Sequence, residues 1–209
     1  MQGLEKITHF GLIRHAQTFW NREKRIQGHS DSPLTPEGEQ QAHRWGKILK
    51  QFSWNRLLAS DTGRALATAE IINSRLKLPL TVDSRLREQD WGRWAGKTIR
   101  QVDEEAAGAV KEQVKAGWEF CPPGGETRRE VLQRSREALQ DAAEWYPGES
   151  LLVVSHEGVA KCLIYHLYGR KFLPGEPPIL ESYRLHRLSC SSGELRIEEL
   201  NAVELESQV

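Results

Sequence analysis

The sequence predicts an α/β fold with a mostly parallel central sheet flanked by helices. Three short apolar runs have the length and composition of buried strands, at 10–13, 56–60 and 151–155. Segments with apolar side chains at helical spacing follow the strand candidates. Strands that alternate with helices pair in parallel, because the helix carries the chain back across the sheet.

The remaining elements are bounded by capping residues and helix breakers. Thr35 is placed to cap a helix that has Pro36 in its first turn and continues to Leu49. Other helices are expected over 63–76, 127–145 and 158–168, with a weaker helical pattern over 97–120 that ends at Pro122-Pro123-Gly124-Gly125. A short edge strand is expected at 80–82, and 182–200 predicts two antiparallel strands joined at Ser192-Gly193.

Length and charge narrow the class of protein. A chain of 209 residues is compatible with a single domain spanning 1–209. Lys and Arg together number 29, as do Asp and Glu, so no basic excess suggests nucleic-acid binding. No apolar run approaches the roughly 20 residues needed to span a bilayer. Residues 1–8 lack the apolar segment of a signal peptide, and we expect a cytoplasmic protein without a membrane partner.

No metal site or cofactor is expected. The three cysteines, Cys121, Cys162 and Cys190, are widely spaced and form no CxxC pair, so they predict neither a zinc site nor a disulfide framework. Most of the histidines likewise lack the spacing of metal ligands. These are His9, His29, His43, His166 and His186.

Polar residues end each of the three best strand candidates. Arg14-His15 follows the first run, Ser60 ends the second and His156 follows the third. Ligands of open α/β sheets bind at the carboxyl ends of the strands. These side chains are therefore expected to meet in one pocket.

Longer motifs surround these strand ends. In chain order they are Ile13-Arg14-His15 with Asn21 and Gln27-Gly28, Ser60-Asp61 with Gly63-Arg64, Leu86-Arg87-Glu88 with Gly92, Pro123-Gly124-Gly125-Glu126-Thr127, and Val153-Val154-Ser155-His156. In this order and spacing they resemble the histidine phosphatase superfamily, phosphoglycerate mutase-like branch, over about residues 7–200. The resemblance implies a three-layer α/β sandwich and an enzyme that acts on a small phosphate ester.

The resemblance also implies a role for each motif residue. His15 would accept the phosphoryl group, and Glu88 would act as general acid toward the leaving oxygen. The phosphoryl oxygens would be bound by Arg14, Arg64 and His156, with weaker phosphate or substrate contacts from Asn21, Gln27 and Gly28. The chemistry is consistent, because a neutral imidazole attacks a phosphate dianion without repulsion between anions. Guanidinium groups bind the phosphoryl oxygens through paired donors.

Four positions depart from the family pattern. Ala16 replaces the glycine of the family triplet and Gln17 replaces a common glutamate, two small changes that leave the Arg14-His15 pair intact. Ala95 stands where a glutamate is frequent, between Trp94 and Gly96. Glu157 follows His156 where a glycine is common. A carboxylate there is expected to point away from a bound phosphate dianion or to repel it.

Three functions fit the motifs. The first is a phosphatase, the second a phosphoglycerate mutase and the third a catalytically silent protein that binds a phospholigand. The family's mutases carry a longer insertion between the acid and the second histidine, so the short interval from Glu88 to His156 favours a phosphatase. The five central positions are all present, which argues against a silent protein.

The signature does not select the substrate. Phosphatases of alpha-ribazole phosphate, sugar phosphates, phosphoserine and phosphoglycerates share it, and nothing in the sequence indicates an oligomeric state. We expect residues 89–125 to cover the leaving group and so to determine which phosphorylated metabolite is used.

Overall fold

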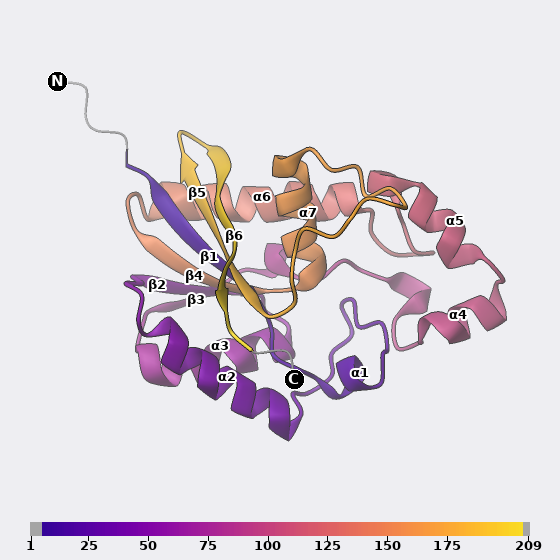
Figure 1. Cartoon of the computed structure of the whole chain (residues 1–209), viewed down its shortest axis with the longest axis horizontal. Coiled ribbons are helices and arrows are strands. Elements are labelled where there is room, and N and C mark those ends of the chain that lie inside the picture. The colour runs from indigo at the N-terminus through magenta and orange to yellow at the C-terminus, as the bar shows by residue number, and fades with distance from the viewer. Residues whose placement is uncertain (1–5, 207–209) are drawn as a thin grey trace.

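A six-stranded sheet runs through the centre of the molecule in the computed structural model, which describes residues 6–206 (Figure 1). The strand order is β3-β2-β4-β1-β5-β6. The first four strands are parallel, while β5 runs antiparallel to β1 and β6 antiparallel to β5. The strands are β1 (Thr8–Arg14), β2 (Arg56–Ala59), β3 (Leu80–Val82), β4 (Ser150–Ser155), β5 (Arg184–Ser191) and β6 (Glu194–Glu204). The predicted mostly parallel sheet is confirmed.

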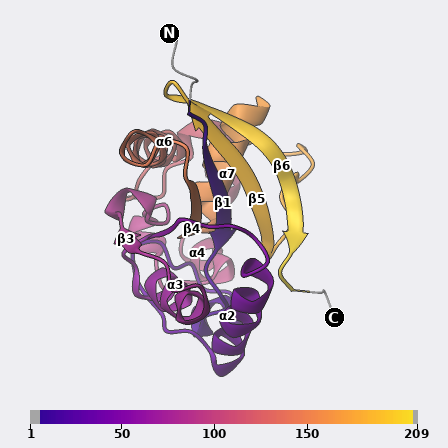
Figure 2. The same cartoon turned by 90° about the vertical axis from the view of Figure 1, so that its left-hand side faces the viewer.

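Two pairs of helices cover the two faces of the sheet (Figures 1 and 2). Helices α2 (Pro36–Leu49) and α3 (Gly63–Leu76) lie on one face, and α6 (Arg128–Trp145) and α7 (Glu157–Tyr168) on the other. Successive side chains of a strand point to opposite faces. In β1, Leu12 accordingly packs with α6 and α7, while Ile13 packs with α2 and α3. The sheet therefore separates two hydrophobic cores.

The predicted helix starts are set by threonine caps. Thr35 Oγ1 accepts a hydrogen bond from the N–H of Gly38 at 2.9 Å, and Pro36 opens α2. Thr127 is the cap of α6 rather than its first residue, and it accepts from the N–H of Glu130 at 3.1 Å. These bonds satisfy N–H groups that have no partner within the helix.

The segment expected to be helical over 97–120 is divided. It contains α4 (Ile99–Glu105) and α5 (Ala109–Lys115), separated by Gly108, whose φ of 77° is left-handed and ends a regular helix. Both helices project beyond the end of the sheet (Figure 1). Trp94, Val102 and Phe120 form a third, smaller core there.

A few other elements differ slightly from the sequence prediction. A short helix, α1 (Phe19–Arg22), lies in the loop after β1, α7 begins one residue earlier than expected, and β6 continues to Glu204. No helix in the part of the chain that the structure describes is long and apolar enough to cross a bilayer. The expectation that residues 1–8 do not form a signal peptide concerns a segment of which residues 1–5 lie outside the described residues.

The carboxyl ends of β1, β4 and β2 meet at one edge of the sheet. Arg14 at the end of β1 is in register with Ser155 at the end of β4, and Ala59 of β2 is in register with Val154. The N–H of His15 continues this pairing and donates to the carbonyl of Ser155 at 2.9 Å. His15, Ser60 and His156 are thus brought together, as the strand-end rule predicted.

Candidate active site

His15 is buried where β1 ends, and its ring is held in one tautomer. Its Nδ1 lies 2.7 Å from the carbonyl of Ala16, which only accepts, so Nδ1 carries the proton and donates it. Its Nε2 receives the Nε–H of Arg64 at 3.3 Å. Burial, together with the charges of Arg14 and Arg64, lowers the pKa of His15 well below its ordinary value. The ring is therefore neutral near pH 7, with a lone pair on Nε2.

Arg64 is buried in the first turn of α3, the helix that follows β2 in the chain. Its guanidinium donates to the carbonyls of Gly28 and Ser30 at 2.8 and 2.9 Å, and to Oδ1 of Asp31 at 3.0 Å. Burial lowers the pKa of Arg64 while Asp31 opposes this effect, and arginine stays charged in proteins. These bonds fix a cation beside His15.

His156 is completely buried beside His15, with 5.2 Å between the ring centroids. Its Nδ1 faces Nη2 of Arg64 at 3.4 Å, and its Nε2 lies 2.9 Å from Ser60 Oγ and 3.2 Å from Thr62 Oγ1. Burial and the neighbouring Arg64 lower the pKa of His156 well below its ordinary value. His156 does not itself line the cavity described below.

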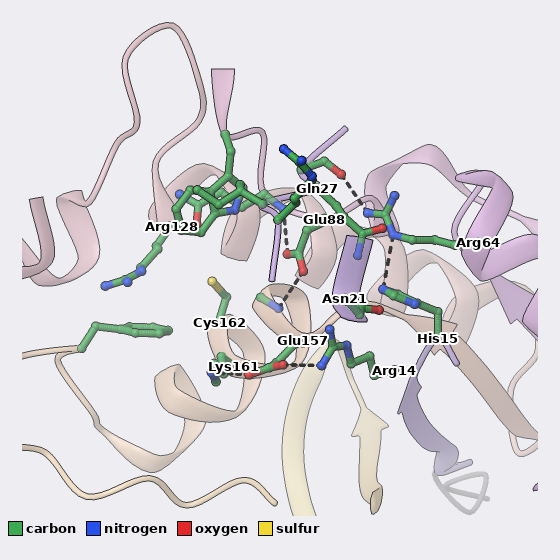
Figure 3. Close-up of a pocket in the computed structure, with 17 residues that line it drawn as sticks. Arg14, His15, Asn21, Gln27, Arg64, Glu88, Arg128, Glu157, Lys161 and Cys162 are labelled. Atoms are coloured by element: carbon green, nitrogen blue, oxygen red, sulfur yellow. Dashed lines mark hydrogen bonds and ion pairs between the residues drawn. The ribbon is translucent and has the colours of Figure 1, made fainter. Parts of the chain in front are cut away.

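Arg14 belongs to a three-residue ion pair that includes Glu157. Nη1 of Arg14 lies 2.7 Å from Oε2 of Glu157, and Nζ of Lys161 lies 2.5 Å from Oε1 of the same carboxylate. Burial raises the pKa of Glu157, but the two cations outweigh it and lower that pKa overall. The carboxylate lines the cavity rather than pointing away from it, and the two cations offset its charge (Figure 3). The other expected outcome, that it repels a bound phosphate dianion, stays a prediction.

Glu88 reaches the same cavity from the loop after β3. Its carboxylate accepts from the N–H of Gln89 at 2.8 Å and from the N–H of Gly158 at 3.2 Å. A Cβ on Gly158 would lie 2.1 Å from Oε1 of Glu88. Only glycine at position 158 therefore leaves space for the Glu88 carboxylate in this position.

Two residues missed by sequence reasoning hold the Glu88 loop in place. Arg134 of α6 donates to the carbonyls of Arg85, Arg87 and Glu88, at 2.6, 2.7 and 3.0 Å. Ser155 Oγ donates to the carbonyl of Leu86 at 2.8 Å. Arg134 lies eight residues after Glu126 and forms an ion pair with it. Nothing in this local spacing indicates that Arg134 also contacts the loop that carries Glu88.

The structure also places the three weaker candidates around the cavity. Asn21 uses Oδ1 to accept from Thr18, which leaves its amide N–H groups without a partner among the described residues. Gln27 is 92% buried, and its Oε1 has no hydrogen-bond partner in the described part of the chain. Gly28 adopts a φ of +56° and contributes its carbonyl to Arg64 rather than an N–H to the cavity.

These side chains line one cavity of about 330 Å³ at the carboxyl end of the sheet (Figure 3). The sequence-predicted residues Arg14, His15, Arg64 and Glu88 all lie on its wall. Sequence reasoning assigned no site role to several lining residues, which come from separate loops and helices: Arg25, Trp91, Arg128, Lys161, Cys162 and Phe172. Within residues 6–206, no group of three or more His, Cys, Asp or Glu side chains is arranged to hold a metal ion.

The model of the histidine phosphatase superfamily (branch 1) matches residues 10–203, which is nearly the whole chain. The chain belongs to the histidine phosphatase superfamily. This confirms the resemblance drawn from the motifs. Membership supports a phosphatase or a mutase that acts on small phosphorylated substrates.

Among the members of the superfamily that resemble this chain, some are named as mutases and others as phosphatases. The probable phosphoglycerate mutase GpmB of Salmonella choleraesuis is 37% identical over 188 residues, which cover 90% of this chain and 84% of that protein. Among solved structures, Bacillus stearothermophilus YhfR has a TM-score of 0.83 at 35% identity, covering 95% of this chain and 98% of that chain.

Two further solved structures are named phosphatases. The mycobacterial glucosyl-3-phosphoglycerate phosphatase Rv2419c has a TM-score of 0.81 at 28% identity, covering 95% of this chain and all of that chain. A putative alpha-ribazole-5'-P phosphatase from Escherichia coli has a TM-score of 0.80 at 25% identity, covering 96% and 99%. The predicted α/β sandwich is thus the fold of these relatives.

Proposed function

We propose that this chain is a phosphomonoesterase that forms a phosphohistidine on His15 and hydrolyses a small phosphorylated metabolite. The observation that carries the proposal is the state of the His15 ring. A backbone carbonyl holds the proton on Nδ1, and the lone pair of Nε2 faces a buried guanidinium in the cavity. A neutral nucleophile beside fixed positive charge suits attack on a phosphate dianion.

In the first step, Nε2 of His15 attacks phosphorus and the bond to the ester oxygen breaks. Glu88, in its protonated form, transfers its proton to that oxygen, and the alcohol leaves. Arg14 and Arg64 offset the charge on the phosphoryl oxygens. In the second step, water attacks phosphorus, Glu88 takes its proton, and the bond from phosphorus to Nε2 breaks to release inorganic phosphate.

His156, Asn21 and Gln27 complete the proposed phosphoryl site. In the structure Nη2 of Arg64, which only donates, faces Nδ1 of His156 at 3.4 Å, so the proton of His156 lies on Nε2 toward Ser60 Oγ. In this proposal that proton moves to Nδ1 before His156 donates to the phosphoryl group. The amide N–H groups of Asn21 supply further donors toward the cavity, whereas the atom of Gln27 that lacks a partner among the described residues is the acceptor Oε1. In this proposal Gly28 acts through its carbonyl, which orients Arg64.

Residues 89–125 are proposed to form the cover over the leaving group within a single domain. Gln89 and Trp91 of this segment line the cavity, and its own small core includes Trp94 and Phe120. The methyl side chain of Ala95 makes no polar contact, and the departure at this position has no structural explanation.

The test measures release of phosphate from p-nitrophenyl phosphate in the presence of a chelator. We expect turnover by the wild-type chain and its loss, by more than about 1,000-fold, in His15→Ala. His43 is exposed on α2, and His43→Ala serves as the matched control with unchanged activity. Rapid quenching with a radiolabelled substrate should trap an acid-labile phosphohistidine on position 15. Turnover that persists in His15→Ala would overturn the proposal, and no turnover at all would point to the silent phospholigand-binding alternative.

A phosphoglycerate mutase is the second candidate, because the curated relatives that share 37% identity carry that name. A mutase returns the phosphoryl group to its substrate instead of passing it to water. Phosphorus NMR of the enzyme with 3-phosphoglycerate separates the two functions. A phosphatase accumulates inorganic phosphate, whereas a mutase accumulates the 2-phospho isomer.

A further inference from the structure

One positive charge in the cavity has no acidic partner. Five Arg and Lys side chains line the cavity, and four of them pair with a carboxylate: Arg14 and Lys161 with Glu157, Arg25 with Glu23, and Arg64 with Asp31. Arg128 is the exception within the part of the chain that the structure describes. Among the described residues, the only hydrogen bond of its side chain runs from Nη1 to the carbonyl of Gly117, at 3.0 Å.

Two aromatic rings hold the guanidinium of Arg128. Its central carbon lies 4.3 Å from the ring centroid of Phe120 and 4.4 Å from that of Phe172. Stacking of this kind occupies the faces of a guanidinium and leaves the N–H donors along its edge available. The side chain is thus positioned by contacts that do not offset its charge.

Placing a charge among apolar groups without a counter-ion is unfavourable, and burial lowers the pKa of Arg128 accordingly. Phe172 also lines the cavity, so the charged group lies at the cavity wall rather than behind it. An anion bound in the cavity would supply the missing partner. A planar guanidinium binds a carboxylate or a phosphate through two parallel hydrogen bonds.

The position of Arg128 indicates which part of a substrate it would meet. It lies across the cavity from His15, with Cys162 and Lys161 drawn between them (Figure 3). In phosphoryl transfer the attacking and leaving oxygens or nitrogens are roughly in line with phosphorus. The leaving alcohol therefore departs from the phosphoryl group on the side away from His15, toward Arg128.

We propose that Arg128 binds a second anionic group, a carboxylate or a further phosphate, on the leaving-alcohol portion of the substrate. This inference rests on the proposed phosphatase function and specifies its substrate class. It assigns to Arg128 a role in specificity that is separate from the binding of the reacting phosphoryl group.

The test compares substrates that differ only in the second charge. Phosphate release is measured from 3-phosphoglycerate and from glycerol 3-phosphate, which share a three-carbon skeleton but differ in one carboxylate. The wild-type ratio of kcat/KM for the two is expected to exceed about 10, since a hydrogen-bonded charge contributes on that scale. The kcat/KM for a bisphosphate of similar size shows whether a second phosphate can take the place of the carboxylate.

Variants then locate the effect. Arg128→Gln should lower the kcat/KM ratio at least about 10-fold, and Arg128→Lys should restore part of it by keeping the charge. The adjacent Arg129 pairs with Glu119 at the surface, so Arg129→Gln should keep the wild-type ratio.

A wild-type ratio near 1 for every anionic substrate, or an unchanged ratio in Arg128→Gln, would overturn the inference. The wild-type ratio decides the question even if Arg128→Gln fails to fold. If the wild-type chain does not hydrolyse p-nitrophenyl phosphate, that result counts against the proposed function itself rather than against the role of Arg128.

Discussion

Nε of Arg64 lies 3.3 Å from Nε2 of His15, so a buried guanidinium contacts the nitrogen that we propose as nucleophile. The backbone carbonyls of Gly28 and Ser30 fix the rest of the Arg64 side chain. The positive charge is therefore in place before a substrate arrives. Such prearranged charge is effective in catalysis because it requires little reorganisation during the reaction.

Replacing Arg64 by alanine should reduce kcat/KM by about 100- to 1,000-fold, the scale on which a fixed donor to the transition state acts. The physical reason is loss of the charge that offsets the phosphoryl oxygens. Steady-state kinetics with p-nitrophenyl phosphate measure the effect. Arg75 is exposed later on the same helix, and Arg75→Ala is the control. A loss below about 10-fold would remove Arg64 from the proposed site.

Glu157→Gln should strengthen the binding of inorganic phosphate. Glu157 now offsets part of the charge of Arg14 and Lys161, and a neutral amide would leave both cations available to the anion. We expect the inhibition constant for phosphate to fall several-fold, as one charge is worth about that much in a partly hydrated site. Glu137 is exposed on α6, and Glu137→Gln should leave the constant unchanged. A constant that rises in Glu157→Gln would show that the carboxylate mainly orients Arg14.

Gly158→Ala should lower kcat by about 100-fold or more, since a general acid typically contributes about 100- to 10,000-fold. The added Cβ would lie 2.1 Å from Oε1 of Glu88, so the carboxylate must leave its present position. Combining the change with Glu88→Gln should cause little additional loss, because both act on the same group. A fully additive double variant, measured with a substrate that has a poor leaving group, would contradict this coupling.

The kcat/KM should decline at acidic pH. Protonation of His15 removes the lone pair, and because burial and two arginines lower its pKa, the acidic decline falls below the ordinary histidine value of about 6.5. A pH–rate profile checks this limb. In Arg14→Gln the acidic limb should move to higher pH, and an unmoved limb would show that another group controls it.

Much of the fold was predictable from local patterns. The apolar runs of β1, β2 and β4, and caps such as Thr35, are determined within a few residues, so their positions were predicted closely. The segment over 97–120 was less predictable, because Gly108 divides a weak helical pattern and a small aromatic core holds the pieces.

The candidate site divides in the same way. His15, Arg64, Glu88 and His156 stand in motifs, and the rule of strand ends indicated that His15 and His156 converge. The partners of these residues follow no motif. Arg134 holds the Glu88 loop from a helix 46 positions away in the chain, a contact that no short-range spacing reveals.

The sequence by itself determined the family, the alternation of strands and helices, and the set of residues that we propose for phosphoryl chemistry, since each of these depends on short-range patterns. Only the tertiary structure decided which charges are paired. It places Glu157 between Arg14 and Lys161, and it leaves Arg128 between two phenylalanine rings with no carboxylate partner among residues 6–206. The physical reason is that electrostatic pairing depends on distances of a few ångströms between side chains from separate elements, which the order of residues does not specify.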